Sequence, residues 1–79
     1  MAVATYPTIR EGYTGELVIQ LQTFLSILGS KVKVDGVFDI GTRTAVKTFQ
    51  KKCCMEATGV VNRETWSKLM ELAGHVKMV

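Results

Sequence analysis

The amino-acid sequence predicts a mainly α protein, a compact three-helix bundle with short irregular loops and at most a minimal strand pair. Three segments carry apolar residues at helical spacing, and each follows a residue able to cap a helix. The 79 residues suffice for one core, because a chain this short buries only about 60% of its unfolded surface. Hydrophobic residues make up 47% of the chain, which is ordinary globular composition.

The first predicted helix covers residues 17–28, where large apolar side chains recur every three or four positions. Thr14 is its expected N-cap, because a threonine hydroxyl can accept a hydrogen bond from a backbone N–H of the first turn. Gly29 follows the last apolar residue and can adopt the left-handed conformation that ends a helix. Residues 31–38 then predict an extended loop with a turn at Asp35-Gly36.

The second predicted helix covers residues 40–53 and starts after Asp39, an efficient N-cap residue. The third follows Asn62, its expected cap, and is predicted to end before Gly74. The inward positions of these segments predict one core. Its expected members are Val18, Leu21, Leu25, Leu28, Phe38, Val46, Phe49, Val61, Trp66 and Leu69.

A loop-cap-helix pattern occurs twice, 23 residues apart, the difference between positions 36 and 59. Gly36-Val37-Phe38-Asp39 precedes the second predicted helix, and Gly59-Val60-Val61-Asn62 precedes the third. Each copy turns at glycine, directs apolar residues inward and caps a helix with Asp or Asn. Both copies can therefore pack on the first helix.

The sequence predicts a single domain over residues 13–73, preceded by an N-terminal arm at 1–12 and followed by a tail or linker start at 74–79. No stretch reaches the roughly 20 apolar residues of a membrane span, and the start of the chain lacks the features of a signal peptide. Net charge is +3, which slightly favours an anionic partner. Cys53 and Cys54 are adjacent and are interpreted as free thiols, because a bridge between neighbours is strained.

The ordered motifs along the chain resemble the peptidoglycan-binding domain family, a three-helix module found in bacterial and phage cell-wall hydrolases. The resemblance covers nearly the whole chain, and the order and spacing of its motifs are more specific than any single piece. The matching residues are Gly12-Tyr13-Thr14-Gly15, Val18-Ile19-Gln20-Leu21-Gln22, Asp35-Gly36-Val37-Phe38, Thr42, Ala45-Val46, Phe49-Gln50, Thr58-Gly59-Val60-Val61, Thr65-Trp66 and Leu69.

The resemblance implies a noncatalytic domain that binds peptidoglycan noncovalently and holds a tethered cell-wall hydrolase or processing enzyme near its substrate. It implies an extracellular or cell-wall location within a larger protein, a monomer, and no cofactor, membrane or nucleic-acid partner. Two positions depart from the family pattern, which usually has glycine at Asp39 and near Cys53-Cys54-Met55. The second departure costs on the order of 1 kcal/mol if a nonglycine residue there must be left-handed.

Residues suited to catalysis or metal binding are few. His75 stands in the predicted tail without a second histidine, so neither a zinc site nor a Ser-His pair can be assembled. Asp35, Asp39 and Glu64 are the available carboxylates, and turn or capping roles account for them. We therefore expect no catalytic residues and no metal ligands.

Candidate ligand-binding residues are Tyr13, Arg43, Lys47 and Gln50. Arg43 and Lys47 share a basic stripe with Lys51, opposite the apolar face of the second helix; it serves solubility or attracts anionic wall polymers. Tyr13 can present an aromatic face to sugar, whereas the place of Trp66 on an apolar stripe favours packing. Gln22 and Gln50 are expected to hydrogen-bond loop backbone, and a ligand role stays open for either.

Two alternatives come from other functional classes. Related bundles precede metalloprotease catalytic domains, so an inhibitory or protein-docking prodomain is one, although residues 74–79 lack the cysteine of such prodomains. The other is DNA binding, because a basic second helix can imitate a helix-turn-helix protein. Only Arg43 on that helix suits guanine recognition.

Overall fold

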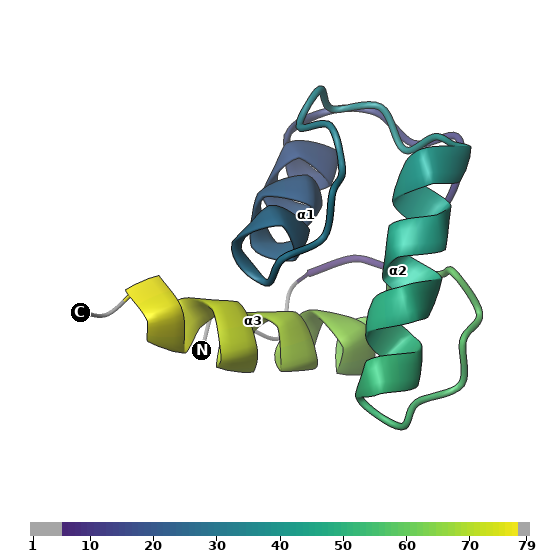
Figure 1. Ribbon diagram of the computed structural model, residues 1–79. Helices are drawn as coiled ribbons and strands as arrows, with labels where there is room; N and C mark the ends of the chain where they lie inside the picture. The colour runs from purple at the N-terminus through teal and green to yellow at the C-terminus, as the bar shows by residue number, and fades with distance from the viewer. Residues whose placement is uncertain (1–5, 78–79) are drawn as a thin grey trace.

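Three helices pack around one core in the computed structural model, which describes the backbone of residues 6–77 and the side chains of 6–73. They are α1 (Glu16–Ile27), α2 (Ile40–Lys52) and α3 (Arg63–Lys77). Helix α2 stands almost upright over the N-terminal end of α3 in Figure 1, and α1 lies in the angle between them. The predicted three-helix fold is confirmed. None of the described helices is long and apolar enough to cross a membrane.

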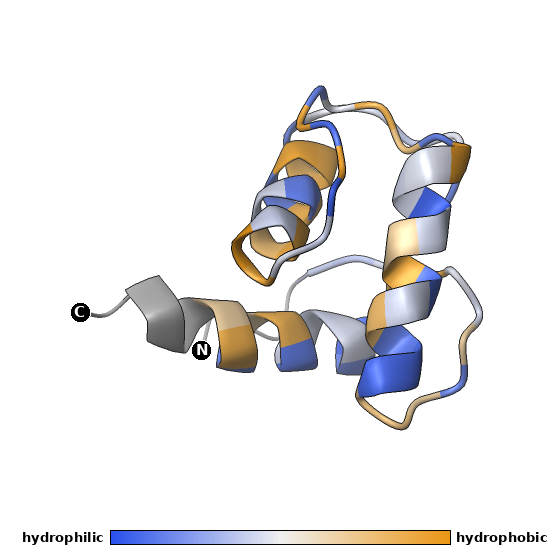
Figure 2. Cartoon of the chain, in the orientation of Figure 1, coloured by the Kyte–Doolittle hydropathy of each residue, from blue (hydrophilic) through white to orange (hydrophobic). Residues whose placement is uncertain are grey.

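The core is built from the inward positions that the helical spacing identified. The predicted residues are less than 9% exposed, except Leu28, which is partly buried at the end of α1. Ile9 and Ala73 join them, with 1% and 0% exposure. Figure 2 shows hydrophobic positions on all three helices, whereas the end of α2 nearest the following connection is hydrophilic. Each helix therefore buries apolar surface in the core, and this burial stabilises the fold by about 25 cal/mol per Å².

The predicted arm contributes directly to this core. Ile9 forms an antiparallel bridge with Val61, in which each N–H donates to the other carbonyl at 3.1 and 2.9 Å. The indole Nε1 of Trp66 donates to the Pro7 carbonyl at 2.8 Å. Residues 7–9 are thus tied to the start of α3. The outer parts of the predicted arm and tail, 1–5 and 78–79, lie outside the described residues.

Two predicted helix ends were wrong. Gly15, not Thr14, occupies the N-cap of α1, at φ 118° and ψ −167°, and makes no side-chain capping bond. Thr14 is instead engaged in an antiparallel bridge with Val37, so its backbone belongs to the loop. Helix α3 continues through Gly74 to Lys77. One glycine inside a helix costs only about 1 kcal/mol relative to alanine, so it need not end one.

The other local predictions agree with the structure. Asp39 caps α2 by accepting a hydrogen bond from the Thr42 N–H at 3.1 Å, and Asn62 accepts one from the Thr65 N–H at 3.0 Å. In place of a strand pair, residues 6–77 contain two isolated bridges, Ile9 with Val61 and Thr14 with Val37. Cys54 has φ 60°, the left-handed conformation foreseen for that turn.

Candidate functional site

Two buried glutamines hold the two turns of the repeat. The Gln22 Oε1 accepts hydrogen bonds from the N–H groups of Asp35 and Gly36 at 3.0 and 2.9 Å. Its Nε2 donates to the Val37 carbonyl and the Thr42 hydroxyl, both at 3.0 Å. The predicted role of this side chain in fixing loop backbone is confirmed.

Gln50 repeats the arrangement one unit later. Its Oε1 accepts from the Gly59 N–H at 3.0 Å, and its Nε2 donates to the Val60 carbonyl at 3.0 Å and the Thr65 hydroxyl at 3.1 Å. Gln22 and Gln50 are 0% and 1% exposed, and no buried polar side-chain atom among the described residues lacks a partner. Gln50 therefore holds the backbone of the Gly59 turn. Direct contact between Gln50 and a ligand stays a prediction.

The outer faces of the two turns differ in chemistry. Gly36 lies against the Ile19 side chain, since a β-carbon on the glycine would be 3.2 Å from Ile19 Cγ1. Gly59 lies against two cationic side chains, with Arg43 Cγ at 2.9 Å and Lys47 Cγ at 3.4 Å from the corresponding position. The same backbone unit thus presents an apolar surface at its first occurrence and a cationic one at its second.

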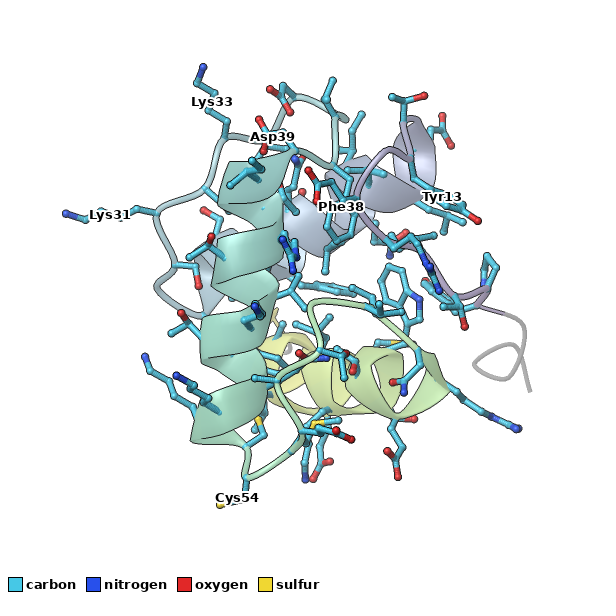
Figure 3. The ribbon with its side chains drawn as sticks, turned by 90° about the vertical axis from the view of Figure 1, so that its right-hand side faces the viewer. Tyr13, Lys31, Lys33, Phe38, Asp39 and Cys54 are labelled. Atoms are coloured by element: carbon cyan, nitrogen blue, oxygen red, sulfur yellow. The ribbon has the colours of Figure 1, made fainter. Side chains whose placement is uncertain are left out.

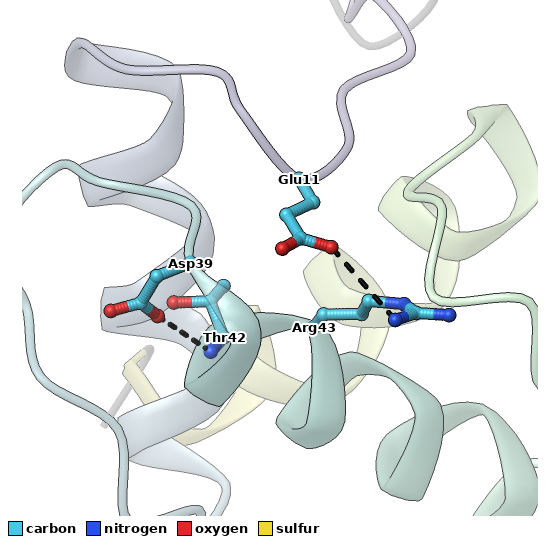
Figure 4. Close-up of polar contacts among 4 residues, drawn as sticks. All are labelled: Glu11, Asp39, Thr42 and Arg43. Carbon is cyan, nitrogen blue, oxygen red and sulfur yellow. Dashed lines mark hydrogen bonds and ion pairs between the residues drawn. The ribbon is translucent and has the colours of Figure 1, made fainter.

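Arg43 also connects this turn to the N-terminal arm. Its Nη1 lies 3.8 Å from Glu11 Oε1, and both side chains are nearly half exposed (Figure 4). An ion pair this exposed contributes about 0–1 kcal/mol, so it adds little to the stability of the fold. Glu11 was not among the predicted site residues. It lies outside the helices, so the periodicity of the sequence could not identify it.

Tyr13 is an exposed aromatic residue of the arm segment that carries Glu11. Its N–H donates to the Arg10 carbonyl at 3.1 Å, and its carbonyl accepts from the Phe38 N–H at 3.0 Å, so its backbone is held at both ends. The side chain is 48% exposed and projects from the arm (Figure 3). An aromatic ring on a restrained backbone can stack on sugar at little entropic cost.

Trp66 belongs to the core, and Tyr6 is partly buried against it. Trp66 is 1% exposed, and the Tyr6 ring packs on it with centroids 4.6 Å apart and planes at 60°. A tilted pair of this kind adds about 0.5–1.5 kcal/mol beyond its buried area. The expected packing role of Trp66 is confirmed.

We call the surface formed by Glu11, Arg43, Lys47 and the Gly59 turn, together with Tyr13 two residues further along the arm from Glu11, the arm face. Arg43 and Lys47 both lie against the Gly59 turn, Gln50 lies beneath it, and Tyr13 belongs to the same arm segment as Glu11. Within the described part of the chain, no three His, Cys, Asp or Glu side chains are placed to hold a metal ion. The side chain of His75 lies outside that part.

A small helical core with solvent-facing cationic and aromatic side chains defines a binding module. The family model of the peptidoglycan binding domain matches residues 14–69, and the chain belongs to this family. The spore cortex-lytic enzyme of Oceanobacillus iheyensis is 40% identical over 70 residues, which are 87% of this chain and 25% of that enzyme. The chain therefore spans a quarter of that relative's length.

Solved structures show the same fold. A peptidoglycan-binding protein from Clostridioides difficile, in complex with glutamine hydroxamate, is similar with a TM-score of 0.84 and 36% identity over 92% of this chain and 45% of that one. The SleB N-terminal domain gives a TM-score of 0.81 and 37% identity, covering 84% of this chain and 92% of that domain. The family resemblance read from the sequence is confirmed.

Proposed function

We propose that this domain binds bacterial peptidoglycan noncovalently and holds an attached cell-wall hydrolase or processing enzyme against its substrate. The observation that carries the proposal is membership in the peptidoglycan-binding family across residues 14–69. Such attachment converts the encounter of enzyme and bond into a nearly intramolecular event, so modest affinity is sufficient. We also propose an extracellular or cell-wall location, where peptidoglycan lies, and a monomeric domain.

The arm face is the surface we assign to this binding. The planar guanidinium of Arg43 matches a carboxylate, the charged group of peptidoglycan stem peptides. Tyr13 supplies an apolar ring for a sugar face. Lys47 adds a second cationic side chain, whose stem lies against the Gly59 turn. We assign the ring to the glycan and the two cations to the carboxylates of its stem peptide.

Cosedimentation with purified sacculi, stripped of attached phosphate polymers, tests the proposal. We expect wild-type protein to be retained and Tyr13→Ala and Arg43→Ala each to weaken retention by about threefold to tenfold, the worth of one partly exposed contact. Arg63→Ala is the matched control, because Arg63 is an exposed arginine at the start of α3 that is not among the residues assigned to the arm face.

These measurements test peptidoglycan binding and the position of the binding site separately. If both arm-face variants bind like wild type, the site lies elsewhere on the domain. If wild-type protein ignores stripped sacculi, the binding function itself is refuted.

A further inference from the structure

A second cationic surface lies on the other flank of α2, where that helix meets the connection that follows α1. A groove of about 250 Å³ is bounded by Ser30 and Lys31 on the connection and by Thr44, Thr48 and Lys52 on α2. Small residues complete its lining, and none of the residues that line it is acidic. Lys31 extends from the connection into solvent in Figure 3. We call this surface the lysine groove.

The lysine groove is separate from the arm face. At 100° per residue, the line through Thr44, Thr48 and Lys52 lies roughly 120° around the axis of α2 from that through Arg43 and Lys47. A ligand in one site therefore leaves the other open. A long polymer that crosses the exposed ridge of α2 could reach both.

Charge distinguishes the lysine groove from two other grooves of the molecule. The groove beside the start of α3, about 340 Å³, is lined by Glu56 and Glu64 as well as Lys68. The groove on the outer side of α1, about 620 Å³, is lined by Glu16, by the uncharged polar residues Gln20 and Thr23, and by apolar residues. Carboxylates repel an anion at such short range. The lysine groove combines two cations with hydroxyl donors and has no opposing charge.

Its ammonium groups are also free of ion pairs with the carboxylates that the structure describes. The ion pairs among these residues are Arg43 with Glu11 and Lys68 with Glu71. Lys31 and Lys52 belong to neither, so an external anion does not have to displace an internal one.

We propose that the lysine groove binds phosphate groups of an anionic cell-wall polymer, a phosphodiester chain attached to peptidoglycan. Lysine is a compact charge suited to phosphate, and the hydroxyls of Ser30, Thr44 and Thr48 can donate to its several oxygens. Arginine, which matches the flat carboxylate, lies instead on the arm face. The inference goes beyond the proposed function, because its ligand is a different polymer.

The test compares sacculi that keep their phosphodiester polymers with sacculi stripped of them by hydrofluoric acid. The double variant Lys31→Gln, Lys52→Gln removes the two ammonium groups of the groove. The double variant Arg63→Gln, Lys68→Gln removes two positive charges from α3 and is the matched control for net charge. All three proteins are the full 79-residue chain, and retention is measured at low salt and at about 0.5 M salt.

On polymer-bearing sacculi at low salt, we expect the groove variant to bind about threefold to tenfold more weakly than wild type, and the control to lose less than about twofold. On stripped sacculi the groove variant should match wild type. If the groove variant and the control lose retention equally, the lysine groove is not a specific site, because the change in net charge would explain both losses. If the groove variant also binds more weakly than wild type on stripped sacculi, phosphate is not the ligand of the groove, and a stem-peptide carboxylate is indicated instead.

Peptidoglycan binding itself is tested by a different measurement, the retention of wild-type protein on stripped sacculi. Wild-type protein that binds polymer-bearing sacculi through Lys31 and Lys52 but ignores stripped sacculi would support the lysine groove and refute peptidoglycan binding.

Discussion

The side chain of Arg43 lies directly over Gly59. A β-carbon at Gly59 would be 2.9 Å from Arg43 Cγ and 3.2 Å from its Nε, while the glycine itself has φ +80°. Because Gln50 holds the Gly59 N–H from below, the turn is enclosed between a buried amide and an exposed guanidinium. Any change at Gly59 should therefore affect both the stability of the domain and the position of Arg43.

Gly59→Ala should lower the free energy of unfolding by about 1–2 kcal/mol, the cost of left-handed backbone in an alanine, and should weaken retention on stripped sacculi. Gly29→Ala is the control, since φ is +100° but nothing lies within 4 Å of the added carbon. Urea denaturation and cosedimentation measure the two effects. Equal binding losses in both variants would exclude a specific effect through Arg43.

Replacing Gln50 by leucine should destabilise the domain by about 2 kcal/mol, because it leaves the Gly59 N–H without its partner and removes one hydrogen bond each from the Val60 carbonyl and the Thr65 hydroxyl. Gln22→Leu should cost as much or more, since Gln22 serves one additional backbone N–H. Chemical denaturation followed by circular dichroism measures both. A cost below 0.5 kcal/mol, on the order of a neutral surface substitution, would show that the turns do not depend on these amides.

Cys54→Gly should raise the free energy of unfolding by about 1 kcal/mol, because Cys54 adopts φ 60° and glycine has no β-carbon to strain there. The neighbouring substitution Lys52→Gly, in the last turn of α2, should instead lower it by about 1 kcal/mol. Thermal unfolding under reducing conditions compares them. If both substitutions destabilise the protein, the Cys54 side chain must stabilise the fold by more than its left-handed backbone costs.

Glu11→Gln should leave stability within about 0.5 kcal/mol of wild type, because its ion pair with Arg43 is long and nearly half exposed. Retention on stripped sacculi should rise about twofold at low salt, since a competing carboxylate leaves the arm face. The gain should vanish at about 0.5 M salt. Weaker binding would instead assign Glu11 the task of positioning Arg43.

Hydrogen bonds from the Val37 N–H and the Gln22 amide hold the pKa of the Asp35 carboxyl below its ordinary value. The ionised form is thus favoured by folding. Its stabilising effect is complete above the unfolded pKa, about 3.9, and is lost as pH falls through the lower folded pKa. NMR titration of Asp35 should give a midpoint below that of an unfolded peptide with the same sequence; an equal or higher midpoint would contradict this.

The proposed binding site could be predicted only in part from the sequence. Helical periodicity marked Arg43 and Lys47 as one stripe, and the glycines around Tyr13 marked it as a surface residue. Neither pattern could show that Arg43 rests on Gly59, 16 positions later, or that Glu11 approaches it from the arm. Those contacts join segments that are far apart in the chain, and side-chain spacing within one helix carries no information about them.

The sequence by itself determined the three helices, the caps at Asp39 and Asn62, most of the core and the family, because these depend on short-range spacing and local hydrogen bonding. Tertiary structure alone decided that Ile9 enters the core, that Gly15 precedes α1, and that α3 passes through Gly74. Ile9 and Gly15 contact distant segments through Val61 and Gly36, whereas a single glycine costs a helix only about 1 kcal/mol and therefore need not end α3. Packing between distant segments contributes more free energy than the local preference of a single residue, so it overrides local signals wherever the two differ.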